Sequence, residues 1–341
     1  MANPSRAPDR KLDARRAADR FMAENPTMPH RTAARILRQQ HPAMFKSIEA
    51  ARDYCRRVTG NHGKRDRGKR KQRPPGKPGA VDPLDLLPPA LKELGDANPF
   101  VIKSERVLAL FDVHIPYHEP VPLRVALEHG HAADVDHILL GGDILDCYAV
   151  SRWQTNPEER DFDNELLRTR EFLSVLRAKF PDVPISYLSG NHEDRWRRYM
   201  WSIAPALTGV TEFKLESLLK FADFNITPIP DLHRVDVGKL NVIHGHEVRI
   251  SAAVNPARGL FLKARESAMC GHLHRTSEHH GNSLTRQHPV ACFSVGALCN
   301  LSPRYNPMGN DWNHGFAVIE HSPKTGHFRV HNHRIIDGAV Y

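Results

Sequence analysis

The pattern of apolar and polar residues changes twice along the chain. Between about residues 11 and 59, apolar residues recur at helical spacing, for example at Ile48, Ala51 and Cys55. An Asn-Pro and a His-Pro step interrupt this pattern, because the residue before a proline is pushed out of the helical region. This segment predicts three short amphipathic helices. They form either a helix-turn-helix-like unit or a small bundle whose arginines only face solvent.

From about residue 100, short apolar runs alternate with stretches of helical spacing. RVLALF, HILL and PISYLS are each followed by such a stretch, which favours an α/β domain. After about residue 225 the chain becomes rich in strand-like runs, among them LNVI, SAMC, VACFSV and GFAVIE. The predicted fold class is therefore α/β, preceded by a small helical N-terminal segment.

A basic stretch separates these two parts. Residues 61–80 hold eight Lys or Arg and one Asp, with three prolines, four glycines and almost no apolar side chain. Such a segment has nothing to bury, so we expect a linker or an arm without a core. The predicted organisation is a helical segment at 1–60, a basic Pro/Gly-rich linker at 61–100 and a larger domain at 101–341.

Composition narrows the class of protein. Hydrophobic residues make up 40% of the chain, which is enough for a core. No apolar run approaches the roughly 18 residues of a membrane helix, and the N-terminus has no apolar signal-peptide core. The five cysteines form no CxxC pair, which favours reduced thiols. We expect a cytoplasmic protein without a membrane partner; its oligomeric state stays open.

Charge is distributed unevenly. Residues 1–80 contain 21 Lys and Arg against 7 Asp and Glu, a formal charge of +14. Residues 81–341 contain the remaining 27 against 32, a charge of −5. A basic segment of this kind can neutralise the phosphates of any nucleic acid, so nucleic acid is the expected partner. The alternative is a spacer that only aids solubility.

Five short polar motifs each begin where an apolar run ends. In an α/β sheet, ligands gather beyond the carboxyl ends of the strands, so loops far apart in sequence can converge there. The motifs are Asp112-Val-His114, Gly141-Gly-Asp143-Ile-Leu-Asp146, Gly190-Asn191-His192-Glu193, His244-Gly-His246 and Gly271-His272-Leu-His274.

These residue types point to metal binding. Asp112 and His114, like His272 and His274, are two positions apart, so on an extended strand end both side chains point the same way. Glycines beside the ligands are expected to let the backbone turn sharply. Seven candidate ligands exceed one tetrahedral zinc site but suit two cations that share a carboxylate. They are Asp112, His114, Asp143, Asn191, His244, His272 and His274.

The ligand types also narrow the metal. Mixed nitrogen and oxygen ligands favour first-row transition metals over Mg²⁺ or Ca²⁺, which prefer oxygen alone. We expect two divalent ions, manganese first, with iron, zinc or cobalt as alternatives.

In this order, the motifs resemble the calcineurin-like metallophosphoesterase superfamily over roughly residues 105–336. The resemblance implies a β-sandwich flanked by helices. It assigns Asp112, His114, Asp143 and His274 to one metal. The second metal shares Asp143 and adds Asn191, His244 and His272. His192 is implied to assist the leaving group or the transition state without binding metal.

Details of the motifs indicate a subgroup. The chain reads GDILDCY where protein Ser/Thr phosphatases look like GDxVDRG, which weakens a protein-phosphatase interpretation. GNHEDR and YNPMGNDWNHGF look like the versions found in phage and prophage members. Arg195 is a candidate for contacting a substrate phosphate, or else part of a solvated helix face. His246 and Trp312 are candidates for supporting or lining the site, with ordinary packing as the alternative.

Three functions remain open from the sequence. The first is a phosphodiesterase or nuclease that uses a metal-bridging hydroxide, with the basic N-terminal region holding the nucleic acid. The second is a phosphatase or phosphodiesterase acting on a small molecule. The third is a non-catalytic binding module, which the complete ligand set disfavours. Fold alone does not separate the first two.

Overall fold

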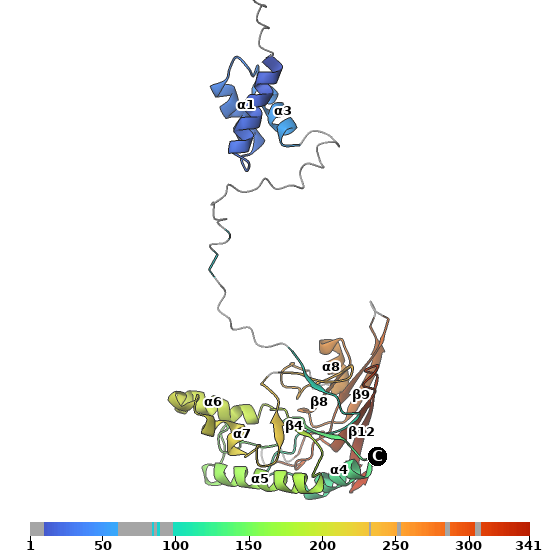
Figure 1. Cartoon of the computed structure of the whole chain (residues 1–341). Coiled ribbons are helices and arrows are strands. Elements are labelled where there is room, and N and C mark those ends of the chain that lie inside the picture. The colour runs from blue at the N-terminus through green and yellow to red at the C-terminus, as the bar shows by residue number, and fades with distance from the viewer. Residues whose placement is uncertain are drawn as a thin grey trace, which may run out of the picture. The chain divides into compact units, whose positions relative to one another are not determined.

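A computed structural model of the chain describes residues 10–60, 84, 87–88, 98–231, 233–250, 254–283, 287–303 and 308–341. Two compact units are distinguished, one within Met1–Glu93 and the other within Leu94–Tyr341 (Figure 1). The predicted linker at 61–100 lies almost entirely outside the described residues. Its character and the predicted domain boundaries therefore stay predictions.

The N-terminal unit contains three helices where the sequence predicts them: α1 (Arg10–Glu24), α2 (His30–Gln40) and α3 (Ile48–Val58). Their apolar faces meet in one small core that includes Ala18 and Leu37. The side chain of Ser47 caps α3 by accepting a hydrogen bond from the backbone N–H of Ala50, at 3.1 Å. The helix-turn-helix-like interpretation stays a prediction.

The larger unit is built on two mixed sheets. In spatial order, the seven-stranded sheet contains β13 (Ala339–Val340), β12 (Phe328–Ile336), β11 (His314–His321), β2 (Arg106–Leu110), β3 (His137–Leu140), β4 (Ile185–Tyr187) and β5 (Ile226–Pro228). The six-stranded sheet contains β1 (Phe100–Ile102), β6 (Val235–Val237), β7 (Leu240–Val242), β8 (Ala268–Cys270), β10 (Pro289–Ser294) and β9 (Ser277–Asn282).

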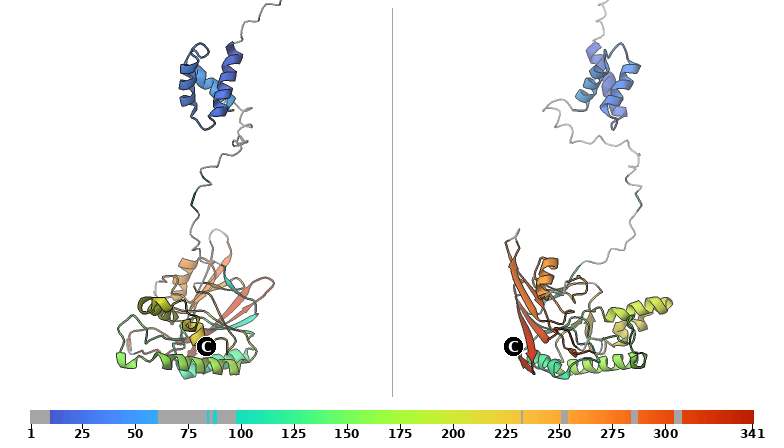
Figure 2. Two further views of the ribbon diagram at one scale, coloured as in Figure 1. Left: turned by 60° about the vertical axis from the view of Figure 1, so that its left-hand side comes forward. Right: turned by 180° about the vertical axis from the view of Figure 1, so that it is seen from behind.

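Helices flank the two sheets. Figure 2 shows α4 and α5 on one side of the strands and α8 on the other. The helices are α4 (Pro120–Ala132), α5 (Phe162–Lys179), α6 (Glu193–Ile203), α7 (Leu215–Leu218) and α8 (Pro256–Ala264). Short 3-10 turns lie at η3 (Pro157–Glu159), η4 (Pro205–Leu207) and η5 (Thr211–Phe213). None of the helices in the described part of the chain combines the length and apolar character that a membrane crossing requires.

Alternation along the strands explains the layers. In β2, Val107 and Ala109 belong to the core between the two sheets, whereas Leu108 and Leu110 belong to the core beneath α4 and α5. A strand buried on both faces reads as a continuous apolar run, as the VLAL of residues 107–110 does. The structure is therefore a β-sandwich flanked by helices within an α/β fold, which confirms the predicted fold class.

The strands that carry the motifs run in parallel. In the seven-stranded sheet, β2 pairs in parallel with β3, and β3 with β4. In the six-stranded sheet, β7 and β10 both pair in parallel with β8. The carboxyl ends of these strands meet at one edge of the sandwich. All five motifs leave the sheets at that edge, as expected from their positions after apolar runs.

Candidate metal centre

The structure brings the first predicted ligand set together around two imidazoles. Nε2 of His114 lies 3.2 Å from Nε2 of His274, which in turn lies 3.3 Å from Oδ1 of Asp112. Oδ2 of Asp143 lies 3.8 Å from Nε2 of His114. These four side chains come from the ends of β2, β3 and β8 and are all buried. Their ligand atoms converge on one point.

The second set also meets at Asp143. Nε2 of His244 is 3.2 Å from Oδ2 of Asp143. One ligand atom from each of Asp143, His244 and His272 lies within 4.8 Å of the other two. His272 and Asn191 are partly exposed, so solvent reaches this side of the centre. Asp143 is thus the side chain that the two sets share.

Three buried polar atoms at this centre have no hydrogen-bond partner among the described residues. They are Oδ1 of Asp112, Oδ1 of Asn191 and Nε2 of His244. Leaving a buried polar atom unpaired costs about 1–3 kcal/mol, so native proteins rarely tolerate three together. Each of these atoms is a metal ligand type, and each belongs to the predicted set. The residues present therefore fit two divalent cations.

The charges within the centre suit cations. Burial alone raises the pKa of a carboxyl group, but the facing imidazoles outweigh burial and hold the pKa values of Asp112 and Asp143 below their usual range. Burial lowers the pKa of His272 to about 4, assisted by the neighbouring His244. Burial also lowers the pKa of His114. Ionised carboxylates and neutral imidazoles are the forms that bind metal.

His244 and His274 behave differently: the carboxylate of Asp112 outweighs burial and raises the pKa of His274, and His244 responds in the same way to Asp143. Burial lowers the pKa of His244, but the carboxylate of Asp143 outweighs burial and raises it to about 10. A proton on this imidazole supplies positive charge between carboxylates, where a cation would otherwise lie. Metal binding would release that proton.

The backbone at the ligands is not extended, which corrects the sequence-based expectation. Asp112 and His114 have φ angles of 53° and 51°, and His272 and His274 have 65° and 55°. These left-handed conformations are unfavourable for residues with a Cβ and are typical of functional sites. Each ligand pair therefore points inward because the ligands themselves turn the chain.

The neighbouring glycines serve two purposes, of which the sequence predicted only the first. Gly142 has a φ of 101°, a conformation that favours glycine. Gly190 does not have a positive φ. Glycine is needed there because the side chain of Asp143 lies too close for a Cβ. A Cβ there would lie 2.2 Å from Oδ1 of Asp143. Gly190 thus allows the loop after β4 to pass directly beside the shared carboxylate.

The buried carboxylate of Glu193 ties two of the motif loops together. Its oxygens accept hydrogen bonds from the backbone N–H of Asp143, Ile144, Leu145 and Gly190 and from the hydroxyl of Tyr187, at 2.7–3.1 Å. One side chain therefore fixes the loop after β3 against the loop after β4. The sequence analysis assigned no role to Glu193, although a carboxylate in the first turn of a predicted helix is a recognisable signal.

His192 lies beside the shared carboxylate and is held from both ring nitrogens. Its Nδ1 is 2.8 Å from the carbonyl oxygen and 3.0 Å from Oδ1 of Asp146, and its Nε2 is 2.7 Å from Nη2 of Arg195. Burial lowers the pKa of His192, but the carboxylates of Asp143 and Asp146 outweigh it and raise the pKa. Arg195 contacts His192 directly and so lies at the centre. A residue that contacts a substrate phosphate would have to lie there.

Asp146 supports the first ligand set through a hydrogen bond. Its Oδ1 accepts from Nδ1 of His114 at 2.8 Å, so the other nitrogen of that ring is free to face the metal site. An acceptor behind a metal-binding imidazole fixes the orientation of the ring and its tautomer. This contact between Asp146 and His114 was not predicted from the sequence.

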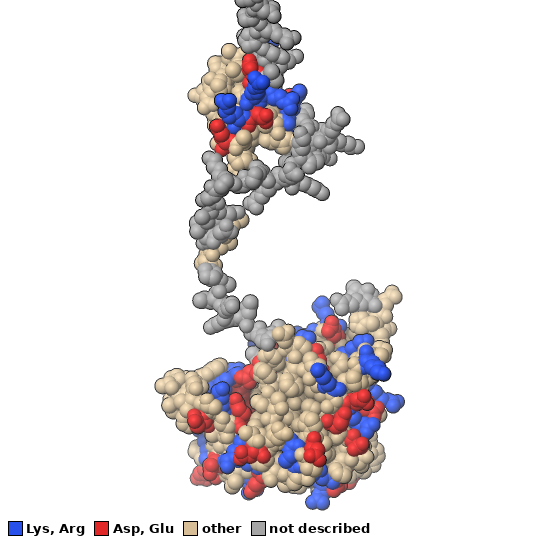
Figure 3. All heavy atoms as spheres, in the orientation of Figure 1, with Lys and Arg blue, Asp and Glu red and all other residues tan. Residues whose placement is uncertain are grey.

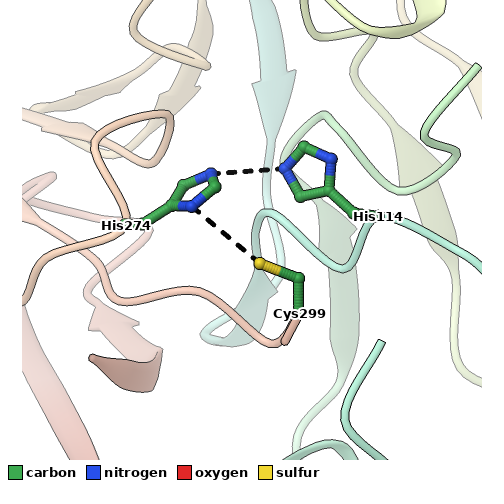
Figure 4. Close-up of side chains that lie close together, drawn as sticks. All are labelled: His114, His274 and Cys299. Atoms are coloured by element: carbon green, nitrogen blue, oxygen red, sulfur yellow. Dashed lines mark hydrogen bonds between the residues drawn. The ribbon is translucent and has the colours of Figure 1, made fainter. Parts of the chain in front are cut away.

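Cys299 was also not predicted as part of the centre. Figure 4 shows the ring of His274 between His114, which faces its Nε2, and the thiol of Cys299, which lies 3.9 Å from its Nδ1. Burial raises the pKa of this thiol. Because the sulfur faces the opposite ring nitrogen from His114, it supports the orientation of His274. No spacing in the sequence links residue 299 to the motifs.

Trp312 and His246 both pack near residues of the centre. The ring of Trp312 packs edge-on against His274, with centroids 4.2 Å apart. The ring centroid of His246 lies 5.4 Å from that of His244 and 6.3 Å from that of His272. Both candidates from the sequence are therefore neighbours of predicted ligands.

Comparison with known proteins finds a similar protein in a phage. No family model matches the chain. The gene 54 protein of Mycobacterium phage D29 is 29% identical over 230 residues, which cover 63% of this chain and 89% of the phage protein. This relative agrees with the predicted phage-type resemblance.

Solved structures show weaker likenesses. A single mutant of Vps29 from Entamoeba histolytica has a TM-score of 0.37 and 12% identity, covering 69% of this chain and 96% of its own. The Pseudomonas putida nuclease MPE has a TM-score of 0.30 and 13% identity, covering 62% and 83%.

Replacing Glu193 with glutamine tests how the centre is held. A glutamine offers one acceptor oxygen to five donors, and its NH₂ group faces other N–H groups. We expect Glu193→Gln to lower the free energy of unfolding by about 2–4 kcal/mol in urea denaturation. The exposed Glu212 is the matched control, since Glu212→Gln should change stability by less than about 0.5 kcal/mol. Equal stability of the two variants would contradict the role given to Glu193.

Proposed function

We propose that this chain is a calcineurin-like metallophosphoesterase that hydrolyses a phosphodiester at a dinuclear metal centre. The observation that carries the proposal is the set of three unpaired buried ligand atoms, on Asp112, Asn191 and His244, arranged around Asp143. A non-catalytic module would have no reason to retain unpaired polar atoms that destabilise its fold. The seven proposed metal ligands are Asp112, His114, Asp143, Asn191, His244, His272 and His274.

The proposed chemistry divides between the cations and the chain. Two divalent ions, when bound, would activate water and neutralise the charge of the phosphoryl oxygens. Asp143 holds both ligand sets at a fixed separation. His192 lies 3.8 Å from Oδ2 of Asp143, at the edge of the centre, where its imidazole can stabilise or protonate the leaving oxygen. Asp146 fixes the ring through Nδ1, so Nε2, which faces Arg195 in this structure, is the nitrogen that the leaving oxygen would meet in place of Arg195.

The preferred substrate is a nucleic acid. Residues 10–60 carry twelve Lys and Arg against five Asp and Glu. Figure 3 shows basic side chains gathered on the visible face of the N-terminal unit, with fewer acidic ones among them. A basic unit in the same chain as a phosphoesterase supports a nuclease role, because contacts with phosphates bring any nucleic acid to the enzyme without reading its sequence. A small-molecule phosphoester is the competing substrate.

Two substitutions separate metal binding from proton transfer. Asp143→Asn weakens both ligand sets, so we expect hydrolysis of a chromogenic diester to fall below about 1% with loss of metal. His192→Ala should keep its metals and lose about 10²–10⁴-fold in kcat. Metal content by mass spectrometry and steady-state kinetics provide the measurements. Loss of metal from the His192 variant, or full activity in it, would refute the role of His192.

Removing the N-terminal unit tests the partner. A protein that begins near residue 98 should still hydrolyse a small diester but lose most of its affinity for DNA. The affinity of the full chain should fall with salt by a log–log slope of about 0.9 per phosphate contacted on duplex DNA. Fluorescence anisotropy across a salt titration measures both. Equal DNA affinity of the full and truncated chains would favour a small-molecule substrate.

A further inference from the structure

A cavity of about 720 Å³ opens beside the second ligand set. Its walls are α6, the segment that carries η5 and α7, the residues after β5, and the loop after β7. The volume lies within the range of natural ligand sites. Neither the metal ligands nor the proposed proton transfer uses it, so its purpose is unassigned.

The cavity reaches the metal centre through two residues. Gly190, which touches Asp143, lies in its wall, and so does His246, whose ring neighbours both His244 and His272. Nδ1 of His246 is buried and has no hydrogen-bond partner among the described residues, although Oε2 of Glu247 lies 3.6 Å away. The ring of His246 therefore lies between the cavity and the predicted ligands, where a ligand that extends from the metals into the cavity would pass it.

Aromatic and apolar side chains line the cavity farther from the metals. Trp201 and Phe213 both contribute to it, and they are 56% and 38% exposed, so a ligand can reach them. The guanidinium of Arg197 lies 5.1 Å from the centroid of the Trp201 ring. Ile229 and Met200 add apolar surface at the wall. Exposed aromatic rings in a cavity favour a flat, apolar partner.

The charges in the cavity exclude a polyanion. Arg197 pairs with Asp194 and Asp231, and Arg198 pairs with Asp194, so two of its basic side chains are already neutralised. Lys214 is the remaining basic side chain that lines the cavity, and the acidic Glu216 and Glu247 line it as well. A chain of phosphates would find no net positive charge here. An uncharged ring fits, with its phosphate held at the metals.

We propose that this cavity binds the nucleoside next to the scissile phosphate, with its base stacked against Trp201 and its sugar or phosphate oxygen facing His246. The proposal rests on the proposed phosphodiesterase function and names its substrate as a nucleotide ester. Stacking of a base on an aromatic side chain strengthens binding by roughly five- to a hundredfold. Most of the selectivity for nucleosides therefore comes from α6.

The test compares two substrates with one leaving group. The substrates are the p-nitrophenyl ester of thymidine 5′-phosphate, or its 3′ isomer, and methyl p-nitrophenyl phosphate. We expect the metal-loaded wild-type protein to prefer one nucleoside ester by about tenfold or more in kcat/KM, mainly through KM. Trp201→Ala should lower this preference by at least about fivefold, and Trp201→Phe should restore most of it.

Trp153 provides a matched control. It is 66% exposed, and the guanidinium of Arg152 lies 4.9 Å from its ring centroid, as Arg197 lies near Trp201, but it does not line the cavity. Trp153→Ala should therefore keep the nucleoside preference. No preference in the wild-type protein, or an equal loss on both substrates in Trp201→Ala, would overturn the proposal.

A binding experiment distinguishes failure of the proposed phosphodiesterase function from failure of the proposed nucleoside site. If the metal-loaded wild-type protein hydrolyses neither substrate, the proposed function fails. Isothermal titration calorimetry with thymidine 5′-monophosphate then tests whether the cavity binds a nucleotide, independently of hydrolysis. At least about fivefold weaker binding to Trp201→Ala than to wild type and Trp153→Ala would support the nucleoside site, and equal affinities would overturn it.

Discussion

The hydrogen bonds of Glu193 hold the centre in its shape. Five donors share one buried carboxylate, and four of them are backbone N–H groups of the loops that carry Asp143 and Asn191. Hydrogen bonds to an ionised acceptor are stronger than neutral ones, and their loss in a buried site is costly. The position of the shared carboxylate therefore depends on a residue that faces away from the metals. The same residue begins α6, which forms a wall of the nucleoside cavity.

The backbone of the ligands is strained. Asp112, His114, Asp143, His272 and His274 all have φ angles between 51° and 65°, in a region that costs of order 1 kcal/mol or more for each residue. Buried strand ends and backbone hydrogen bonds keep these residues in place. Because the strain is already present, bound cations need not reshape the loops. The centre is preorganised for metal binding.

The sequence predicts those parts of this protein that depend on the spacing of apolar and polar residues within a short segment. Apolar runs before each motif place the ligands at strand ends, and helical spacing in residues 10–60 predicts the three N-terminal helices. Contacts between distant residues leave no such trace. Cys299 and Asp146 act on imidazoles through the tertiary fold, and the left-handed φ of His114 depends on pairing between the loops after β2 and β3. The cavity is likewise formed by segments whose aromatic residues look like ordinary helix faces in sequence.

The central claim is that two metal ions share Asp143. The most direct measurement is a crystal structure of the protein grown with Mn²⁺, with anomalous diffraction recorded to locate the ions. The account predicts two anomalous peaks about 3.5–4 Å apart on either side of Asp143. One peak should lie among Asp112, His114 and His274, and the other among Asn191, His244 and His272. A single peak, or peaks away from Asp143, would contradict the account.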